Sequence, residues 1–184
     1  GTIDDESDDR CVQLSASTTA LLSDSVVCLA VDVEGDMWVG TAEGPVVFDG
    51  GGDIFNGHQG SRIKVEQDGV LNYLFGEETI YSIAIDGANR KWFGTGSGVF
   101  VQSPAGNEEV ASYTTANSPL LDNRIIDIAI DGNNGLVYVA TAGGIMSLRS
   151  DAIDGGPIHS DDVYAFPNPV RPDYDGPIAI RGLA

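Results

Sequence analysis

Three segments of the sequence place an aspartate, a short polar turn, an aromatic residue and a threonine in the same order. A tryptophan in such a segment could stack on a sugar ring, so we first considered a binding site. The aligned residues are Asp32, Trp38 and Thr41, then Asp86, Trp92 and Thr95, then Asp131, Tyr138 and Thr141. Because the same residue types recur at one place in each copy, we interpret them as structural. The aspartate would accept N–H groups of the turn, and Trp38 and Trp92 would pack in the core.

Metal-binding chemistry has little support. His58 and His159 are about a hundred positions apart, with no cysteine or carboxylate at ligand spacing. The turn Asp131–Gly135 (DGNNG) is similar to a calcium loop but lacks the distal bidentate glutamate. We therefore expect a hairpin turn there and no metal site.

Catalytic and phosphate-binding patterns are also missing. The glycine-rich run at Gly94–Gly98 (GTGSG) lies between strands and does not open a helix, and no Gly-X-Ser-X-Gly segment occurs. The paired carboxylates Asp4–Asp5 and Asp161–Asp162 lie in charged, loop-like segments, which favours solvated side chains. We predict a protein that is not an enzyme, has no cofactor and has no site residue that the sequence alone can assign.

The net charge of the chain disfavours two classes of partner, and its two cysteines predict no structural site. The 28 acids against nine Lys plus Arg give a net charge of −19, which disfavours nucleic acid and anionic membrane surfaces. No apolar run is long enough for a membrane helix. Cys11 and Cys28 fit neither a disulfide framework nor a zinc site, so we expect ordinary thiols, although one disulfide between them stays open.

The three copies predict β-structure throughout. In the first strand of each copy, bulky residues alternate with an alanine, as at Leu29, Ala30 and Val31. Bulky side chains on one face and small ones on the other are typical of sheets stacked face to face. The first predicted strands are Val26–Asp32, Ile80–Asp86 and Ile125–Asp131, the second Met37–Thr41, Lys91–Thr95 and Val137–Thr141, and the third Pro45–Asp49, Val99–Gln102 and Ile145–Leu148.

A fourth strand is expected over Ile63–Gln67 and over Val110–Thr114, with none after the third copy. Four-stranded units at intervals of 54 and 46 residues predict an all-β protein, a partial β-propeller of about three antiparallel blades. The expected organisation is an acidic segment with the last strand of a preceding blade (1–20, strand Val12–Ala20), blade 1 (21–70), blade 2 (71–118), a degenerate, incomplete blade 3 (119–155), and a linker with the first strand of a β-sandwich (156–184).

The segments MWVGT and KWFGT resemble the two-component regulator propeller repeat, and YVATAGG is a degenerate copy of it. This resemblance covers residues 21–150 and implies a cell-envelope protein, mostly of Bacteroidetes. One setting that it implies is the periplasmic sensor of a hybrid two-component regulator that binds oligosaccharides.

The tail VYAFPNPVRPDYDGPIAIRGL resembles the start of the C-terminal β-sandwich of type IX secretion proteins, with a new strand over Pro177–Ile180. Together the two resemblances imply a non-catalytic recognition or scaffold module of that secretion system, at the outer-membrane surface or in the periplasm. Its implied partners are the secretion machinery or a surface sortase, with a lipopolysaccharide glycan as a further ligand.

Three blades do not close a ring, since propellers have about four to eight. Either the sequence is a piece of a longer propeller, which we expect, or several copies combine to complete a ring. The open stack should expose apolar faces and favour self-association.

Overall fold

A computed structural model of the chain describes residues 11–50, 59–67, 69–153, 164–166 and 179–181. The chain divides into two compact units, Gly1–Ile153 and Asp154–Ala184. All regular elements in the described residues are strands. No helix there is long and apolar enough to cross a membrane.

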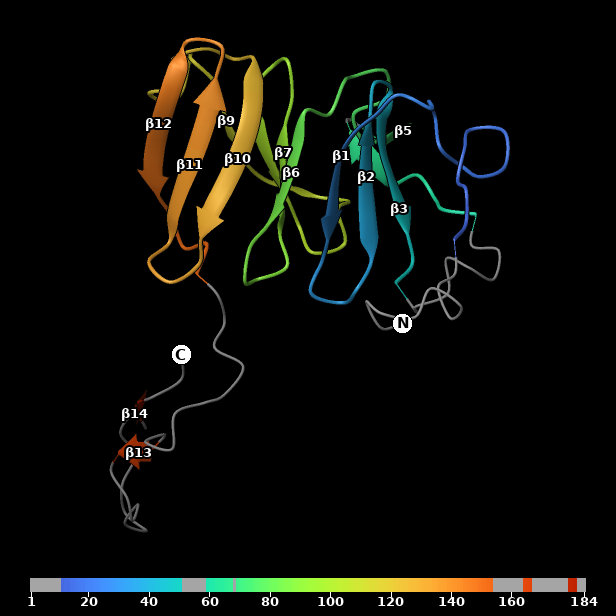
Figure 1. The fold of residues 1–184 in the computed structure, drawn as a ribbon. Coiled ribbons are helices and arrows are strands. Elements are labelled where there is room, and N and C mark those ends of the chain that lie inside the picture. The colour runs from blue at the N-terminus through green and yellow to red at the C-terminus, as the bar shows by residue number, and fades with distance from the viewer. Residues whose placement is uncertain (1–10, 51–58, 68, 154–163, 167–178, 182–184) are drawn as a thin grey trace, which may run out of the picture. The chain divides into compact units, whose positions relative to one another are not determined.

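Three antiparallel sheets stand side by side in the first unit (Figure 1). The first contains β1 (Val26–Val31), β2 (Met37–Thr41) and β3 (Gly44–Phe48). The second contains β6 (Ser82–Ile85), β7 (Lys91–Gly94), β8 (Val99–Gln102) and β9 (Glu109–Tyr113). The third contains β10 (Ile125–Asp131), β11 (Leu136–Thr141) and β12 (Gly144–Arg149). Each sheet follows chain order, as in the blades of a partial β-propeller.

The strand register confirms the two-faced pattern. Ala84 lies opposite Trp92, which lies opposite Val101, so these three residues share one face of the second blade. Ala30 and Trp38 form the same pair in the first blade. Because side chains alternate along a strand, the bulky residues that flank each alanine point to the opposite face.

Neighbouring blades pack the alanine and tryptophan face of one sheet against the isoleucine face of the next. Between blades 1 and 2, Trp38 and Ala30 pack with Ile83 and Phe93. Between blades 2 and 3, Trp92 packs with a cluster that includes Ile128, Val137 and Val139. Strand β6 contacts both β1 and β10, so the first strands of the three blades are neighbours. The stacking that the alternation predicted is confirmed.

The fourth strand of blade 1 differs from the prediction. Residues 64–67 form β4 (Lys64–Gln67), but β4 pairs with the unpredicted β5 (Val70–Tyr73) in a separate hairpin. Among the residues that the structure describes, the Val47–Ser61 bridge is the one strand pairing that joins this region to β3. Gly69, with φ of 76°, turns the chain so that β5 takes the partner position beside β4. The hairpin accounts for the longer first interval, and only blade 2 shows four strands in the described residues.

The strand predicted over Val12–Ala20 is wrong, because the described residues 11–20 contain no strand and residues 16–18 form a turn. The backbone N–H groups of Thr18 and Thr19 donate to the carbonyl of Ser15, and the hydroxyl of Thr19 donates to the same carbonyl at 2.9 Å. Such local bonds compete with a strand ladder. Leu14 and Leu21 from this segment pack against the outer face of blade 1.

The second unit contains a two-stranded antiparallel sheet of β13 (Tyr164–Phe166) and β14 (Ala179–Arg181). Strand β14 overlaps the strand predicted over Pro177–Ile180. The two prolines that follow Phe166 lie outside the described residues. The β-sandwich and the domain boundaries stay predictions.

Candidate functional site

The recurring aspartate is a structural residue in the first blade. Its Oδ1 atom accepts the backbone N–H groups of Glu34 and Asp36, both at 2.9 Å. Its Oδ2 atom accepts the indole N–H of Trp38 at 3.1 Å. Asp32 therefore closes the β1–β2 turn and fixes the tryptophan, as the sequence interpretation proposed, and its oxygens are already occupied by the fold.

Blade 2 repeats the arrangement. Asp86 accepts the backbone N–H groups of Ala88 and Arg90, and the indole N–H of Trp92 donates to it at 2.9 Å. Trp92 is 1% exposed. The guanidinium of Arg90 bonds Asp86 and also reaches Asp151, which lowers the pKa of the Asp151 carboxyl below its usual value.

A buried ion pair joins blade 2 to blade 1. The Nζ atom of Lys91 lies 2.9 Å from Oδ2 of Asp32 and donates to the carbonyls of Asn89 and Pro104. It also lies 5.1 Å from the centre of the Trp38 ring. Burial on its own would raise the pKa of Asp32, but the hydrogen bonds from Lys91, Trp38 and Asp36 bring it below its usual value.

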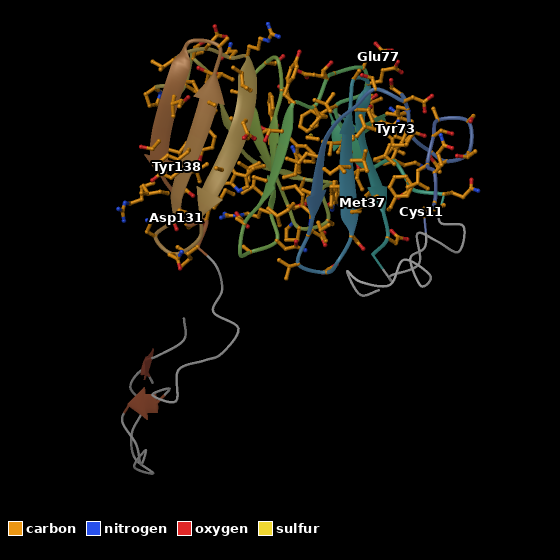
Figure 2. All side chains as sticks on the ribbon, viewed as in Figure 1. Cys11, Met37, Tyr73, Glu77, Asp131 and Tyr138 are labelled. Atoms are coloured by element: carbon orange, nitrogen blue, oxygen red, sulfur yellow. The ribbon has the colours of Figure 1, made fainter. Side chains whose placement is uncertain are left out.

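The third copy differs from the first two in its turn sequence and in having tyrosine in place of tryptophan. The Asp131 carboxylate accepts the backbone and side-chain N–H groups of Asn133 and the side-chain N–H of Asn134. The DGNNG segment is thus a turn at the end of β10, and its carboxylate is occupied by the turn. Tyr138, in place of tryptophan, is 42% exposed and lies toward the outside of the third sheet (Figure 2).

The Gly-Thr step is also structural. The hydroxyl of Thr95 donates to the carbonyl of Gly98 and accepts the N–H of Ser97, so GTGSG is the turn between β7 and β8. A Cβ atom on Gly94 would lie 2.6 Å from Cγ2 of Ile125, which is fully buried. The glycine is therefore needed for the approach of the next blade. The third copy has Ala140 at this position, on the face that no described blade covers.

Other sequence candidates are not brought together. His58, His159, Asp4, Asp5, Asp161 and Asp162 lie outside the described residues. No group of three His, Cys, Asp or Glu suited to a metal ion is present in the described part of the chain. Cys11 is exposed and Cys28 half-buried, and both are free thiols.

A pocket that the sequence did not indicate lies between the β4–β5 hairpin and blade 2. It has a volume of about 570 Å³ and is bordered by the β4–β5 hairpin with the following loop on one side, and by β8 and the start of β9 on the other. Figure 2 labels Tyr73 and Glu77 on the segment that borders it. Its lining residues are Val65, Glu66, Asn72, Tyr73, Leu74, Phe75, Gly76, Glu78, Phe100, Gln102, Asn107, Glu108 and Glu109.

The pocket combines an aromatic wall with acidic and amide groups. Phe75 lies 5.3 Å from Phe100 and 5.2 Å from Phe93, measured between ring centroids. The backbone of Phe75 has φ of 46°, a conformation that non-glycine residues rarely adopt. Such positions concentrate at functional sites, although that tendency assigns no ligand. No sequence pattern indicated this pocket, because its aromatic and acidic residues are not among the recurring Asp, Trp, Gly and Thr positions.

Comparison with known proteins identifies the repeat. Residues 20–43 match the model of the two component regulator propeller family. The first repeat is of the two-component regulator propeller type, and the second and third copies share its Asp, aromatic and Thr positions. Their Asp, Trp and Gly-Thr positions are the ones that the structure uses for the turn, the core and the blade interface.

Two solved structures are similar to this chain in sequence and fold. PorZ of Porphyromonas gingivalis, described as an essential bacterial surface component of the type-IX secretion system, is 31% identical with a TM-score of 0.67 over 86% of this chain and 22% of PorZ. The extracellular domain of a putative hybrid two component system of B. thetaiotaomicron is 28% identical with a TM-score of 0.56, over 72% of this chain and 16% of that one. The chain thus spans about a fifth of the length of these propeller-repeat relatives.

An ancestral GH74 enzyme shares the fold at 17% identity, with a TM-score of 0.51 over 77% of this chain and 20% of the enzyme. At that identity the likeness extends to the fold alone. The sequence matches no curated protein.

Proposed function

We propose that this chain is part of a PorZ-like component of a type IX secretion system and acts as a non-catalytic recognition or scaffold module. The observation that carries the proposal is the 31% identity to PorZ over 86% of the chain. The VYAFPNPV tail, similar to the start of the sandwich of type IX secretion proteins, supports the same assignment.

The proposed location is the cell envelope, at the outer-membrane surface or in the periplasm. Both relatives support it, since one is a surface component and the other an extracellular domain. The proposed partners are proteins of the secretion machinery or a surface sortase, and a lipopolysaccharide glycan. The net charge of −19 disfavours nucleic acids, which are polyanions, as partners.

The non-catalytic role is supported by how the polar groups are used. Asp32, Asp86 and Lys91 are fully engaged in the turns and the blade interface. In the pocket, Glu66, Glu108 and Glu109 are exposed to solvent. A carboxylic acid that protonates a leaving group at neutral pH needs an apolar environment, which these three lack.

Deletion of the gene in its source bacterium tests the proposed function. Cargo proteins that carry the type IX C-terminal signal should stay in the periplasm and fail to reach the cell surface, as measured by immunoblotting of cell fractions. The complemented strain is the control. Normal surface display of such cargo in the deletion strain would contradict the proposal.

The second candidate is the periplasmic sensing part of a hybrid two-component regulator that binds oligosaccharides. It is favoured by the 28% identity to the extracellular domain of such a system. For this candidate, the deletion strain would display cargo normally but lose a transcriptional response to one oligosaccharide in the growth medium. Transcript profiling across a panel of glycans separates the two.

A further inference from the structure

The repeats do not explain the charge of the pocket between the β4–β5 hairpin and blade 2. None of its lining residues is one of the recurring Asp, Trp, Gly or Thr residues. We propose that this pocket binds a basic side chain, Lys or Arg, of a partner protein. The inference rests on the proposed recognition role and names the chemistry of the group that is recognised.

The charged residues that line the pocket are all acidic, and Arg62, outside the lining, contacts the ring of Tyr73 at its border. Four glutamates line it, Glu66, Glu78, Glu108 and Glu109, and no Lys, Arg or His is among the described lining residues. A concave surface lined by one sign of charge concentrates counter-ions. A single exposed ion pair contributes little, so a cation gains most where several carboxylates surround it.

The shape favours an organic cation over a metal ion. The pocket volume of about 570 Å³ falls in the range of ~300–1,000 Å³ that is typical of organic ligands. The described glutamates do not converge, since no group of three metal-binding side chains is found in the described part of the chain. A long side chain with a terminal charge can reach carboxylates that stand apart from one another.

The aromatic wall suits the stem of such a side chain. Tyr73, Phe75 and Phe100 line the pocket, and aliphatic stems of Lys and Arg pack on aromatic rings. The chain already makes one contact of this kind, because the guanidinium of Arg62 lies 3.8 Å from the centre of the Tyr73 ring.

Gln102 is the second, independent indication of a ligand. It is 2% exposed and lines the pocket, and its side-chain amide makes no hydrogen bond to any residue that the structure describes. Gln102 lines the pocket, and its amide is not a fully buried group without a partner, since the described residues contain none. Its carbonyl oxygen can accept an N–H from an ammonium or guanidinium group.

A titration of the ¹⁵N-labelled 184-residue chain tests the proposal. The probe is the capped peptide acetyl-Gly-Ser-Arg-Ser-Gly-amide, and its matched control replaces arginine by the neutral isostere citrulline. The side-chain amide signals of Gln102, Asn72 and Asn107 report on the pocket directly. We expect saturable shifts of the Gln102 signals with the arginine peptide and none with the citrulline peptide. Equal shifts with both peptides would overturn the proposal, as would saturation of the same signals by calcium alone.

Matched variants separate the pocket from the overall negative charge. Glu78→Gln with Glu109→Gln removes two charges from the lining, and Glu34→Gln with Glu43→Gln removes two exposed charges elsewhere. The pocket pair should weaken peptide binding by ~5–10-fold, and the control pair by less than about twofold. Equal weakening by both pairs would show non-specific attraction and overturn the inference.

The two proposals fail in different experiments. If the Glu78→Gln, Glu109→Gln variant abolishes peptide binding while cargo display stays normal, the cation site is confirmed and secretion does not depend on it. If the deletion strain fails to display cargo but the chain does not bind the arginine peptide, the cation site is rejected and the proposed secretion role stands.

Discussion

The ammonium group of Lys91 lies 2.9 Å from the carboxylate of Asp32, so a side chain of the second blade neutralises the turn aspartate of the first. Lys91 is fully buried and Asp32 is 7% exposed. The pair adds a link between blades to the apolar contacts, and one partner without the other would leave a buried charge.

Lys91→Met should lower the free energy of unfolding by about 3–5 kcal/mol, because Asp32 would stay buried without its cation. The folded-state pKa of Asp32 lies below its usual value, so its contribution to stability is present above pH ~4 and is lost as the pH falls through the folded-state pKa. The variant should therefore lose less stability than the wild type on acidification. Urea unfolding from pH 7 to pH 3 measures both effects.

The matched control is Lys64→Met, which removes an exposed lysine of β4. Its unfolding free energy should change by about 0.5 kcal/mol or less. Equal losses in the two variants would mean that the Lys91–Asp32 pair is not a stabilising contact.

The Gly94→Ala variant tests the close approach of blades 2 and 3. A Cβ atom at this position would lie 2.6 Å from Cγ2 of Ile125, in a packed interface where the neighbour cannot easily move. We expect a loss of about 1–3 kcal/mol in the free energy of unfolding. Gly96→Ala is the control, since the nearest atom to its Cβ would be 4.0 Å away and its backbone is not in the left-handed region. A neutral Gly94→Ala would refute the packing role of this glycine.

The Trp92→Ala variant should lose about 3–5 kcal/mol, because the ring is 1% exposed and packs in the cluster between blades 2 and 3. The equivalent residue of the third copy, Tyr138, is 42% exposed, so Tyr138→Ala should cost about 1 kcal/mol or less. Thermal and urea unfolding of both variants provide the comparison. Similar losses at the two positions would contradict the different packing of the two blade faces.

These contrasts show how far the sequence predicts the fold. The order Asp, aromatic residue, Gly-Thr was enough to place Trp38 and Trp92 in the core, because it recurs with the alternation of bulky residues and alanine. It did not show that the indole N–H donates to the aspartate or that Lys91 crosses to the preceding blade. Those contacts join residues that only the twist and spacing of the sheets bring together.

The parts that the sequence did not predict lie where the repeat is interrupted. Strand β5 lies in the longer interval between the first two copies, and the pocket combines residues of that interval with Phe100 and Gln102 of β8. The recurring Asp, Trp, Gly and Thr positions are not among its lining residues, so comparison of the copies did not indicate it. The sequence predicts a strand at Ser15, but hydroxyl groups bond the local backbone there and hold the chain in a turn. The alternation of apolar residues does not reveal such bonds. The candidate site therefore depends on the structure much more than the blades do.

The two thiols should differ in reactivity. Burial raises the pKa of the Cys28 thiol to about 11, with a smaller increase from Asp127 and an opposing effect of a backbone hydrogen bond from Gly40. Cys11 is exposed. At pH 8 a thiol reagent should label one cysteine per folded chain and two in urea, since the thiolate is the reactive form. The Cys11→Ser variant should show no rapid labelling. Rapid labelling of the folded variant would place Cys28 in a more open environment.

The two end faces of the blade stack should bind each other. Leu29 and Val31 are 61% and 65% exposed and occupy the positions that Ile83 and Ile85 hold in the second blade. Tyr138, at the other end, occupies the position of Trp92. Leu14 and Leu21 cover the end face of blade 1 over β2 and β3, so the exposed part of it is the β1 strip of Leu29 and Val31. We expect this strip to pair with the Tyr138 face of another copy, in a head-to-tail association that can extend beyond a dimer.

Sedimentation velocity across a range of protein concentrations measures this association. The 184-residue chain should form dimers and larger species as the concentration rises, and Leu29→Glu should shift it to monomer because a charge would enter an apolar interface. Val110→Glu is the control, since it changes an exposed apolar residue, 53% accessible, of β9 that lies on neither end blade. A chain that stays monomeric throughout, or equal effects of the two substitutions, would exclude the end faces as the contact.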